Sequence, residues 1–246
     1  MTLKENIITT VNGIINTDFE EEEVNYVPDI KDPKLTFGNK GLLFEGTVLY
    51  IDMRGSTEIL NNHHKKTVAK IHISYFHTIV KIAKEFGGEV RSFNGDSMLV
   101  FFPGTTQESL SNGVKAAMKM RYMLADPDSG INKTLKKYSP IDFGIGIDYG
   151  KILCTKIGIG GDSTNKDLVW IGNAVNKSTR LGDTAKLPDA ISISSHVYNN
   201  LLDYAKCSTE KNWLGQDVKV NMWKQNTFAY NNQPEYYYYT HYRWPL

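Results

Sequence analysis

Two aspartates stand where this chain can hold a metal ion. Asp52 ends an apolar run that begins at Gly46, and Asp96 lies in the turn Asn94-Gly95-Asp96-Ser97 between two strand-like segments. Carboxylate oxygens are the ligands that hard divalent cations prefer. Either aspartate alone is typical of a turn or a helix N-terminus. Together they predict a pair of metal ligands that the second hairpin brings side by side.

The segment that follows Asp52 is suited to a phosphate. Arg54, Gly55, Ser56 and Thr57 come directly after the apolar run. Glycine allows a close approach to the backbone, and amide groups at such a turn can bind an anion. We therefore expect substrate contacts over residues 54–57.

A second group of polar residues lies much later in the chain. A helix is predicted from Gly172 onward, and Asn176 and Arg180 are four residues apart in it. Residues at this spacing share one face of a helix. An amide and a guanidinium there can hold a ribose and a developing phosphate charge.

Length and charge exclude several classes of protein. The chain has 246 residues and a formal net charge of +1. Balanced charge provides no footprint for nucleic acid or for an anionic membrane. The sequence contains no apolar run near the roughly 20 residues of a membrane span and no secretory signal. We expect a cytosolic protein, in which Cys154 and Cys207 remain reduced structural thiols.

The first 44 residues differ in character from the rest. They contain a short amphipathic opening and the acidic run at residues 18–23. We interpret residues 1–44 as an N-terminal arm whose acidic run is a solvated face, and residues 45–246 as one catalytic domain.

The domain mixes strands and helices in an order that suits an α+β fold with one sheet. Periodicity predicts one helix over residues 57–86 and another over 107–124, and a hairpin around Asp96. A second hairpin is expected around Tyr149-Gly150, from residues 141–148 and 151–157. Further elements are expected at residues 167–171, 191–193, 195–204, 218–222 and 235–242, with loops at 126–130 and 158–164.

Four segments resemble the catalytic domain of class III nucleotide cyclases, from about Gly46 to the end of the chain. Any one of them is a weak signal, but four in the family's order are specific. The resemblance implies a ferredoxin-like domain with a mixed, mostly antiparallel sheet and helices packed on it. The matching segments are Leu49–Thr57, Phe93–Asp96, Gly144–Gly150 and Gly172–Arg180.

The resemblance also implies a mechanism. In such cyclases two Mg²⁺ or Mn²⁺ ions are held by two aspartates and a backbone carbonyl, here Asp52, Asp96 and Met53. The ribose 3′-oxygen attacks the α-phosphate of a nucleoside triphosphate and pyrophosphate leaves. Family precedent places Asn176 on the ribose and Arg180 on the α-phosphate. It supplies both from the partner subunit of a homodimer with two interface sites.

The positions that read the base depart from the purine cyclases. Adenylate cyclases carry a lysine where this chain has Ser92, and an aspartate or threonine where it has Val169; guanylate cyclases use glutamate and cysteine. Selectivity for a purine depends on such paired polar groups. Arg91 and Trp170 are large neighbours that can narrow the pocket. The pattern resembles the pyrimidine cyclases of the bacterial Pycsar anti-phage system, which make cyclic UMP or cyclic CMP to trigger a separate effector.

Alternatives stay open at this point. One alternative is an adenylate cyclase with an unusual pocket, and another is a silent cyclase-fold module that only binds nucleotide or dimerises, although such modules usually lack one of the residues present here as Asp52, Asp96, Asn176 and Arg180. The preference for UTP over CTP rests only on the uracil acceptors, and Lys219 and Lys224 are equal candidates for a triphosphate contact. His63-His64 is expected on the polar side of the long helix, and Tyr236–Tyr239 in a packed terminal strand.

Overall fold

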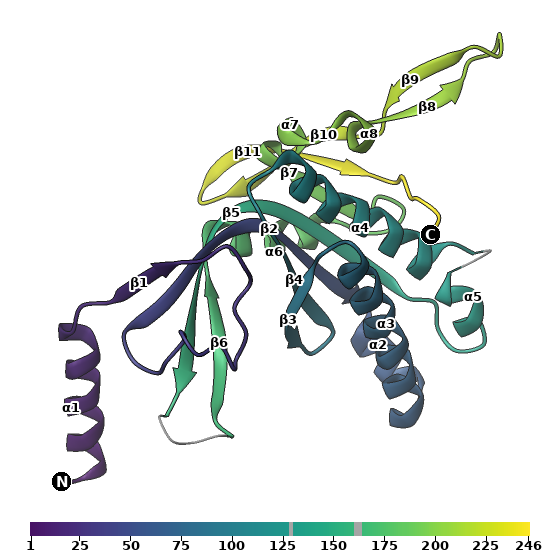
Figure 1. Cartoon of the computed structure of the whole chain (residues 1–246). Coiled ribbons are helices and arrows are strands. Elements are labelled where there is room, and N and C mark those ends of the chain that lie inside the picture. The colour runs from purple at the N-terminus through teal and green to yellow at the C-terminus, as the bar shows by residue number, and fades with distance from the viewer. Residues whose placement is uncertain (128–129, 160–163) are drawn as a thin grey trace.

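The computed structural model describes residues 1–127, 130–159 and 164–246, so that parts of two expected loops, residues 128–129 and 160–163, lie outside the description. Figure 1 shows a twisted sheet with helices packed on it. The strands are β1 (Glu20–Glu23), β2 (Lys40–Arg54), β3 (Glu89–Asn94), β4 (Ser97–Pro103), β5 (Asp142–Gly158), β6 (Lys166–Ile171), β7 (Ile191–Ser194), β8 (Cys207–Lys211), β9 (Asp217–Asn221), β10 (Lys224–Tyr230) and β11 (Gln233–Thr240).

The sheet runs in the order β10-β11-β7-β5-β2-β4-β3, with β1 added to β2, and β6 to β5. Its pairs are antiparallel except for β5 with β7 and β1 with β2. The α+β class and the mixed, mostly antiparallel sheet are therefore confirmed. The helices are α1 (Leu3–Asn16), α2 (Ser56–Asn62), α3 (Lys65–Glu85), α4 (Gln107–Ala125), α5 (Ile131–Leu135), α6 (Asn173–Thr184), α7 (Ser195–Asn200) and α8 (Asp203–Lys206).

Strands β2 and β5 form the long centre of the sheet. They pair without interruption from Gly41 opposite Thr155 to Arg54 opposite Asp142. The hairpin expected around Tyr149-Gly150 is therefore wrong, because both residues lie inside β5. A two-residue hairpin turn needs a positive φ, and Gly150 is not among the described glycines that have one.

The two faces of β2 pack against different helices. Leu49, Ile51 and Met53 lie in the main core cluster with the apolar faces of α3 and α4. Phe44 and Val48 lie in a second cluster with Ala174 and Val175 of α6. This division follows from the alternation of side chains along a strand. The Asp52 side chain points to the opposite face from its neighbours Ile51 and Met53. It therefore lies on the face of the sheet that α6 covers.

Two expected helices are each divided in the structure. The helix predicted over residues 57–86 is α2 and α3, separated by the extended backbone of His63 and His64. The histidines thus form the break rather than a polar side, and the His63 ring nitrogen Nε2 lies 2.7 Å from Ser139 Oγ. The helix predicted over 195–204 is α7 and α8, separated by extended Leu201 and Leu202. Apolar residues continue across the second break, whereas the first falls in the polar stretch from Asn61 to Lys66, which is also compatible with the exposed side of one helix.

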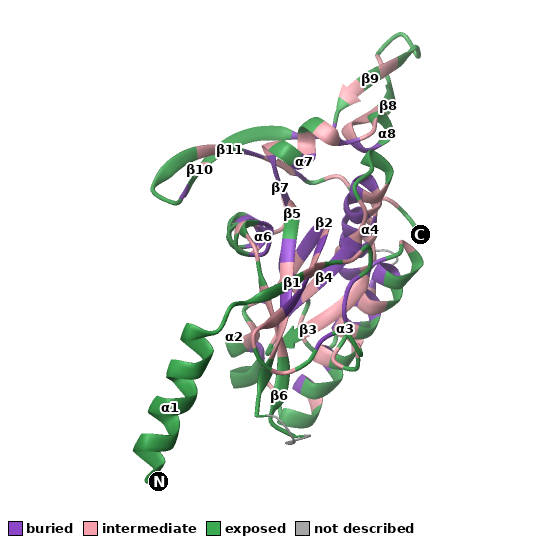
Figure 2. Ribbon diagram, turned by 60° about the vertical axis from the view of Figure 1, so that its left-hand side comes forward, coloured by how far each residue is buried: buried purple, intermediate pink, exposed green. Residues whose placement is uncertain are grey.

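The first 44 residues contain the projecting helix α1 and the strand β1. Every residue of α1 is exposed, as Figure 2 shows, and Asn39 Nδ2 donates to the Ile14 and Thr17 carbonyls at its end. Strand β1 consists of the four glutamates 20–23 and pairs with β2 at Lys40–Leu43. Three of these glutamates are exposed, so the acidic run lies mainly in solvent.

The remaining expectations concern thiols and membranes. Cys154 is buried, Cys207 is partly buried, and neither of these two described cysteines forms a disulfide. Burial raises the pKa of Cys154 to about 12, so its thiol is a packing group. Across the described residues, the helices are all too short or too polar to cross a membrane.

Candidate active site

The two aspartates meet at the edge of the sheet that is formed by the ends of its central strands. Asp52 lies opposite Ser97 of β4 and Gly144 of β5, in the middle of three paired strands. Asp96 lies in the β3–β4 turn, where Gly95 takes a positive φ of 63°. The Met53 amide donates to the Asp96 carbonyl at 3.4 Å, which places the turn beside the end of β2.

The charge at this edge is mainly negative. The pKa of Asp52 rises to about 6 because the carboxyl is partly buried, because the Asp96 charge is close, and because Asp183 adds a further charge. Arg54 opposes the rise through a bond from Nη1 to Asp52 Oδ2 at 3.1 Å. One guanidinium is thus set against several carboxylates, an arrangement that favours an added cation.

This donor set fits Mg²⁺ or Mn²⁺. Asp52 and Asp96 offer hard oxygen ligands, and Met53 adjoins them through the bond from its amide to the Asp96 carbonyl. Among the described side chains, the structure contains no cluster of three or more His, Cys, Asp or Glu groups that would form a complete cage. A magnesium ion bound through one or two carboxylates plus substrate phosphates needs no such cage.

Residues 54–57 are held in different ways. Hydrogen bonds fix the Arg54 guanidinium. Its Nη2 donates to the Gly182 carbonyl and also, at 3.2 Å, to the Ala185 carbonyl. Gly55 precedes α2 with a positive φ of 68°, and Ser56 and Thr57 open that helix. A hollow of about 310 Å³ lies beside Arg54 and Gly55. The turn therefore borders an open hollow, whose described lining also includes Glu58 and Asp142 but neither Asp52 nor Asp96.

Helix α6 rests on the sheet through glycines. A Cβ on Gly146 would lie 1.9 Å from the Ser178 carbonyl oxygen and 2.2 Å from the Gly182 nitrogen. Only glycine permits this approach, which explains the Gly144-Ile145-Gly146 part of the cyclase-like pattern. The opposite side of α6 presents Asn176 and Arg180, both of which are exposed.

Within one chain, the described charges that act on Asp52 do not include Arg180. The described charges that shift the pKa of Asp52 are Asp96, Arg54 and Asp183. Arg180 instead lowers the pKa of Tyr230, which burial raises. Within one chain, Arg180 therefore belongs to the β10–β11 side of α6.

The residues expected to surround the base, Ser92, Val169 and Trp170, lie on both faces of the sheet. Ser92 lies opposite Leu99 after a β-bulge at Arg91, and Leu99 packs with Trp170 against the Phe44–Phe101 cluster. The Trp170 ring lies with its centre 4.5 Å from that of Phe101 at an angle of 35°, and its Nε1 has no partner in the part of the chain that the structure describes. Val169 adjoins Trp170 in β6, so its side chain lies on the other face.

The Arg91 side chain is hydrogen-bonded to the N-terminal arm and is not free to contact the base. Its Nε donates to the Pro28 carbonyl at 2.9 Å, and Nη2 donates to the Val27 carbonyl at 3.3 Å. Nη1 pairs with Glu89 at 2.8 Å. The guanidinium thus fastens the arm to the sheet.

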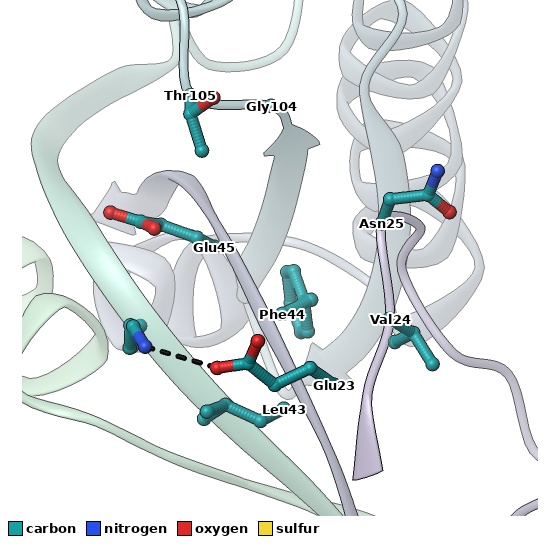
Figure 3. Close-up of a pocket in the computed structure, with 9 residues that line it drawn as sticks. Glu23, Val24, Asn25, Leu43, Phe44, Glu45, Gly104 and Thr105 are labelled. Atoms are coloured by element: carbon teal, nitrogen blue, oxygen red, sulfur yellow. Dashed lines mark hydrogen bonds and ion pairs between the residues drawn. The ribbon is translucent and has the colours of Figure 1, made fainter.

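A separate cavity of about 260 Å³ lies between β1, β2 and β5 and the turn after β4. Figure 3 shows Glu45, Phe44 and the ion pair from Lys151 to Glu23, which is 3.2 Å long. The expected site residues do not line this cavity, and we assign the substrate elsewhere.

Comparison with known proteins decides the family. A model of the adenylate and guanylate cyclase catalytic domain matches residues 44–230. The chain belongs to this family. The cyclase is 30% identical to a uridylate cyclase of Xanthomonas perforans over the whole of both chains. It is 25% identical to a cytidylate cyclase of Staphylococcus aureus, over 63% of this chain and 42% of that one.

A solved structure shows the same fold. The guanylyl cyclase Cya2 superposes with a TM-score of 0.64 at 21% identity, over 81% of the cyclase and 93% of that chain. The class III cyclase fold expected from the four sequence segments is confirmed.

Sequence reasoning missed two groups beside the aspartates. Asp183 is exposed on α6, seven residues after Asn176, and that spacing was the available signal. Tyr75 of α3 is fully buried, and its hydroxyl has no partner among the described residues. Burial and the charges of Asp52 and Asp96 raise its pKa well above the usual range. No sequence pattern distinguishes Tyr75 from the other core aromatics.

The raised pKa of Asp52 predicts a stability effect in the metal-free cyclase. The value of about 6 lies above the ordinary 3.8, so the folded chain binds this proton more tightly than the unfolded chain. Stability is then lost as the pH rises from about 4 through 6. Asp52→Asn should raise stability by about 1–3 kcal/mol at pH 7.5 and by almost nothing below pH 4.

Thermal unfolding in a chelator at both pH values measures this difference. Asp18→Asn on the exposed arm is the matched control and should leave the Tm nearly unchanged. An equal Tm for Asp52→Asn and wild type at pH 7.5 would contradict the assignment of a strained carboxylate pair.

Proposed function

We propose that the cyclase converts a pyrimidine nucleoside triphosphate, UTP in preference to CTP, into the 3′,5′-cyclic monophosphate and pyrophosphate. The observation that carries cyclisation is the pair of aspartates at one sheet edge, with the raised pKa of Asp52. Asp52, Asp96 and the Met53 carbonyl would hold two divalent ions, Mn²⁺ or Mg²⁺, which would supply activation of the 3′-hydroxyl and neutralisation of the triphosphate.

The chain's own residues take the remaining roles. The 3′-oxygen forms a bond to the α-phosphorus while the bond to the β-phosphate oxygen breaks, and pyrophosphate leaves. Asn176 orients the ribose, and Arg180 offsets the charge that develops on the α-phosphate. The open turn at Gly55, with Ser56 and Thr57, binds the phosphates.

We propose a homodimer in which each site combines two chains. Asn176 and Arg180 are exposed on α6, and Arg180 is not among the described charges that shift the pKa of Asp52 in its own chain. A second copy that presents its α6 to this edge would complete the site twice, through a two-fold axis. Residues 1–44 would form the arm and residues 45–246 the catalytic domain.

The base assignment rests on the base-reading positions and on relatives. Ser92 and Val169 cannot form the polar pair that a purine edge requires, and a full-length relative is named a uridylate cyclase. Uracil presents acceptors at O2 and O4, for which the Ser92 hydroxyl is a donor. The bonds of Arg91 to the arm remove it from this role. The biological role we propose is a cytoplasmic one, in which the product activates a separate effector in anti-phage defence.

Incubation with each of the four nucleoside triphosphates and Mn²⁺ tests the proposal. We expect kcat/KM for UTP to exceed that for ATP or GTP by about 10²-fold or more, on the scale at which polar sites reject mismatched groups. Mg²⁺ replaces Mn²⁺ in a parallel series, and a chelator provides the blank.

Each other outcome has a definite meaning. Faster turnover of ATP than of either pyrimidine would identify an adenylate cyclase with an unusual pocket. Binding of nucleotide without release of pyrophosphate from any of the four would identify a silent cyclase-fold module.

A further inference from the structure

Helix α6 must be held at a fixed roll if its exposed side chains are to act on a substrate. Asn176 and Arg180 lie on one face, and Lys177 points about 100° away from Asn176 around the helix. A small rotation about the axis would move both exposed side chains away from their targets. The contacts that prevent such a rotation therefore matter for the proposed reaction.

The C-terminal half of α6 is fixed from the sheet side. Gly182 lies against the Tyr50 ring, where an added Cβ would approach Cδ1 to 2.6 Å. Arg54 donates to the Gly182 and Ala185 carbonyls. These contacts fix one end of the helix but leave its first two turns unexplained.

The N-terminal half is held from the side by the β10–β11 hairpin. Gly172 precedes α6 without a side-chain cap. The Lys177 ammonium instead pairs with Glu235 of β11 at 2.7 Å. It also lies 4.7 Å from the centre of the Tyr230 ring of β10. The Tyr230 hydroxyl bonds to Asn173 Oδ1 at 2.6 Å, so two successive turns of the helix are tied to one hairpin.

The Lys177 end of the Lys177–Glu235 pair is more enclosed than either side chain of the Lys211–Asp217 pair. The Lys177 side chain is 13% exposed, whereas Lys211 and Asp217 at the β8–β9 hairpin are 67% and 63% exposed. Asp148 on β5 is 4% exposed, and the Lys177 charge lowers its pKa while burial raises it. Asp148 is buried, so removing Lys177 would leave its carboxylate without this cation at a cost. The Glu235 side chain is 37% exposed, so the loss of its partner would cost less there.

We propose that Lys177 is a positioning residue, which together with Glu235 and Tyr230 sets the roll of α6 and so directs Asn176 and Arg180 at the substrate. This rests on the proposed cyclase activity, in which those two side chains contact the nucleotide. Lys177 itself touches no substrate. The β10–β11 hairpin thereby acquires a role in turnover.

The test compares full-length Lys177→Met, Lys177→Arg and Glu235→Gln with Lys211→Met, which removes a lysine from an exposed ion pair. Kinetics with UTP and Mn²⁺ should show kcat lowered about 10- to 100-fold in Lys177→Met and Glu235→Gln, with KM changed less than about threefold. Lys177→Arg should keep most of the activity, and Lys211→Met all of it.

Mixing separates positioning from general instability. Lys177→Met mixed with Asp52→Ala should recover activity, since the Asp52→Ala chain supplies an intact α6. Lys177→Met mixed with Arg180→Ala should not rise above Lys177→Met alone, because every site then has an impaired α6. Recovery in both mixtures, or in neither, would overturn the positioning role.

Hydrogen exchange provides a readout that does not need turnover. The amides of α6 should exchange at least about tenfold faster in Lys177→Met than in wild type or Lys211→Met. Unchanged exchange in α6, or unchanged kcat in an active enzyme, would overturn the proposal. A wild type that cyclises no nucleotide would contradict the proposed function instead, and the exchange result would still decide whether Lys177 holds α6.

Discussion

Asp52→Ala and Asp96→Ala should each lower the rate of cyclisation by about 10³-fold or more at saturating Mn²⁺, because each loss removes several kcal/mol of transition-state stabilisation. The two side chains are the carboxylates that the structure places at this edge beside Met53. Asp183 adds charge nearby but is not one of the proposed ligands, so each substitution removes one of the two proposed carboxylate ligands. Initial rates of pyrophosphate release with UTP measure the effect.

Folding must be intact for this result to bear on catalysis. Burial and the Asp96 charge destabilise the ionised Asp52 carboxylate. Its removal should therefore leave the Tm unchanged or higher while the activity is lost. Asp18→Ala on the arm, at the same protein and metal concentrations, is the matched control. Turnover near that of wild type in either site variant would end the two-metal interpretation.

The second large effect concerns Arg180. Arg180→Ala should lower kcat by about 10²-fold or more, as expected when a donor to a developing charge is removed. Its mixture with Asp52→Ala should nevertheless be active. Each heterodimer then contains one site with an intact Asp52 from one chain and an intact Arg180 from the other.

The amount of recovery can be stated. Equal mixing with free exchange makes half of the dimers heterodimers, and each of these has one intact site in two, so roughly a quarter of wild-type activity is expected. Mixing either variant with itself provides the blank. No recovery after exchange is verified with tagged chains would place the whole site within a single chain.

The elements around the aspartates were predictable because they rest on local patterns. The strand into Asp52, the β3–β4 hairpin and the start of α6 each carry their own signal of alternation, turn or helix spacing. Gly146 belongs to one of the cyclase-like segments. A glycine is needed there because the backbone closely approaches Ser178 and Gly182, and that contact joins two segments far apart in the sequence.

What the sequence did not reveal depends on tertiary contacts. Tyr149-Gly150 has the composition of a turn, yet pairing with β2 along its whole length keeps β5 extended. The bulge at Arg91 places it against the arm, and only the structure shows the carbonyls it binds. Lys177 is one charged residue among many until Glu235, which is distant in the chain, is placed beside it.

The unbroken pairing of β2 with β5 has a mechanical consequence. The two strands run from the arm, where β1 joins at Lys40, to the site, where β2 ends at Asp52 and Arg54. A pair of strands hydrogen-bonded at every step bends far less readily than two short strands joined by a loop. We therefore expect a displacement of strand β1 to be passed along this continuous pair of strands toward the end that carries Asp52.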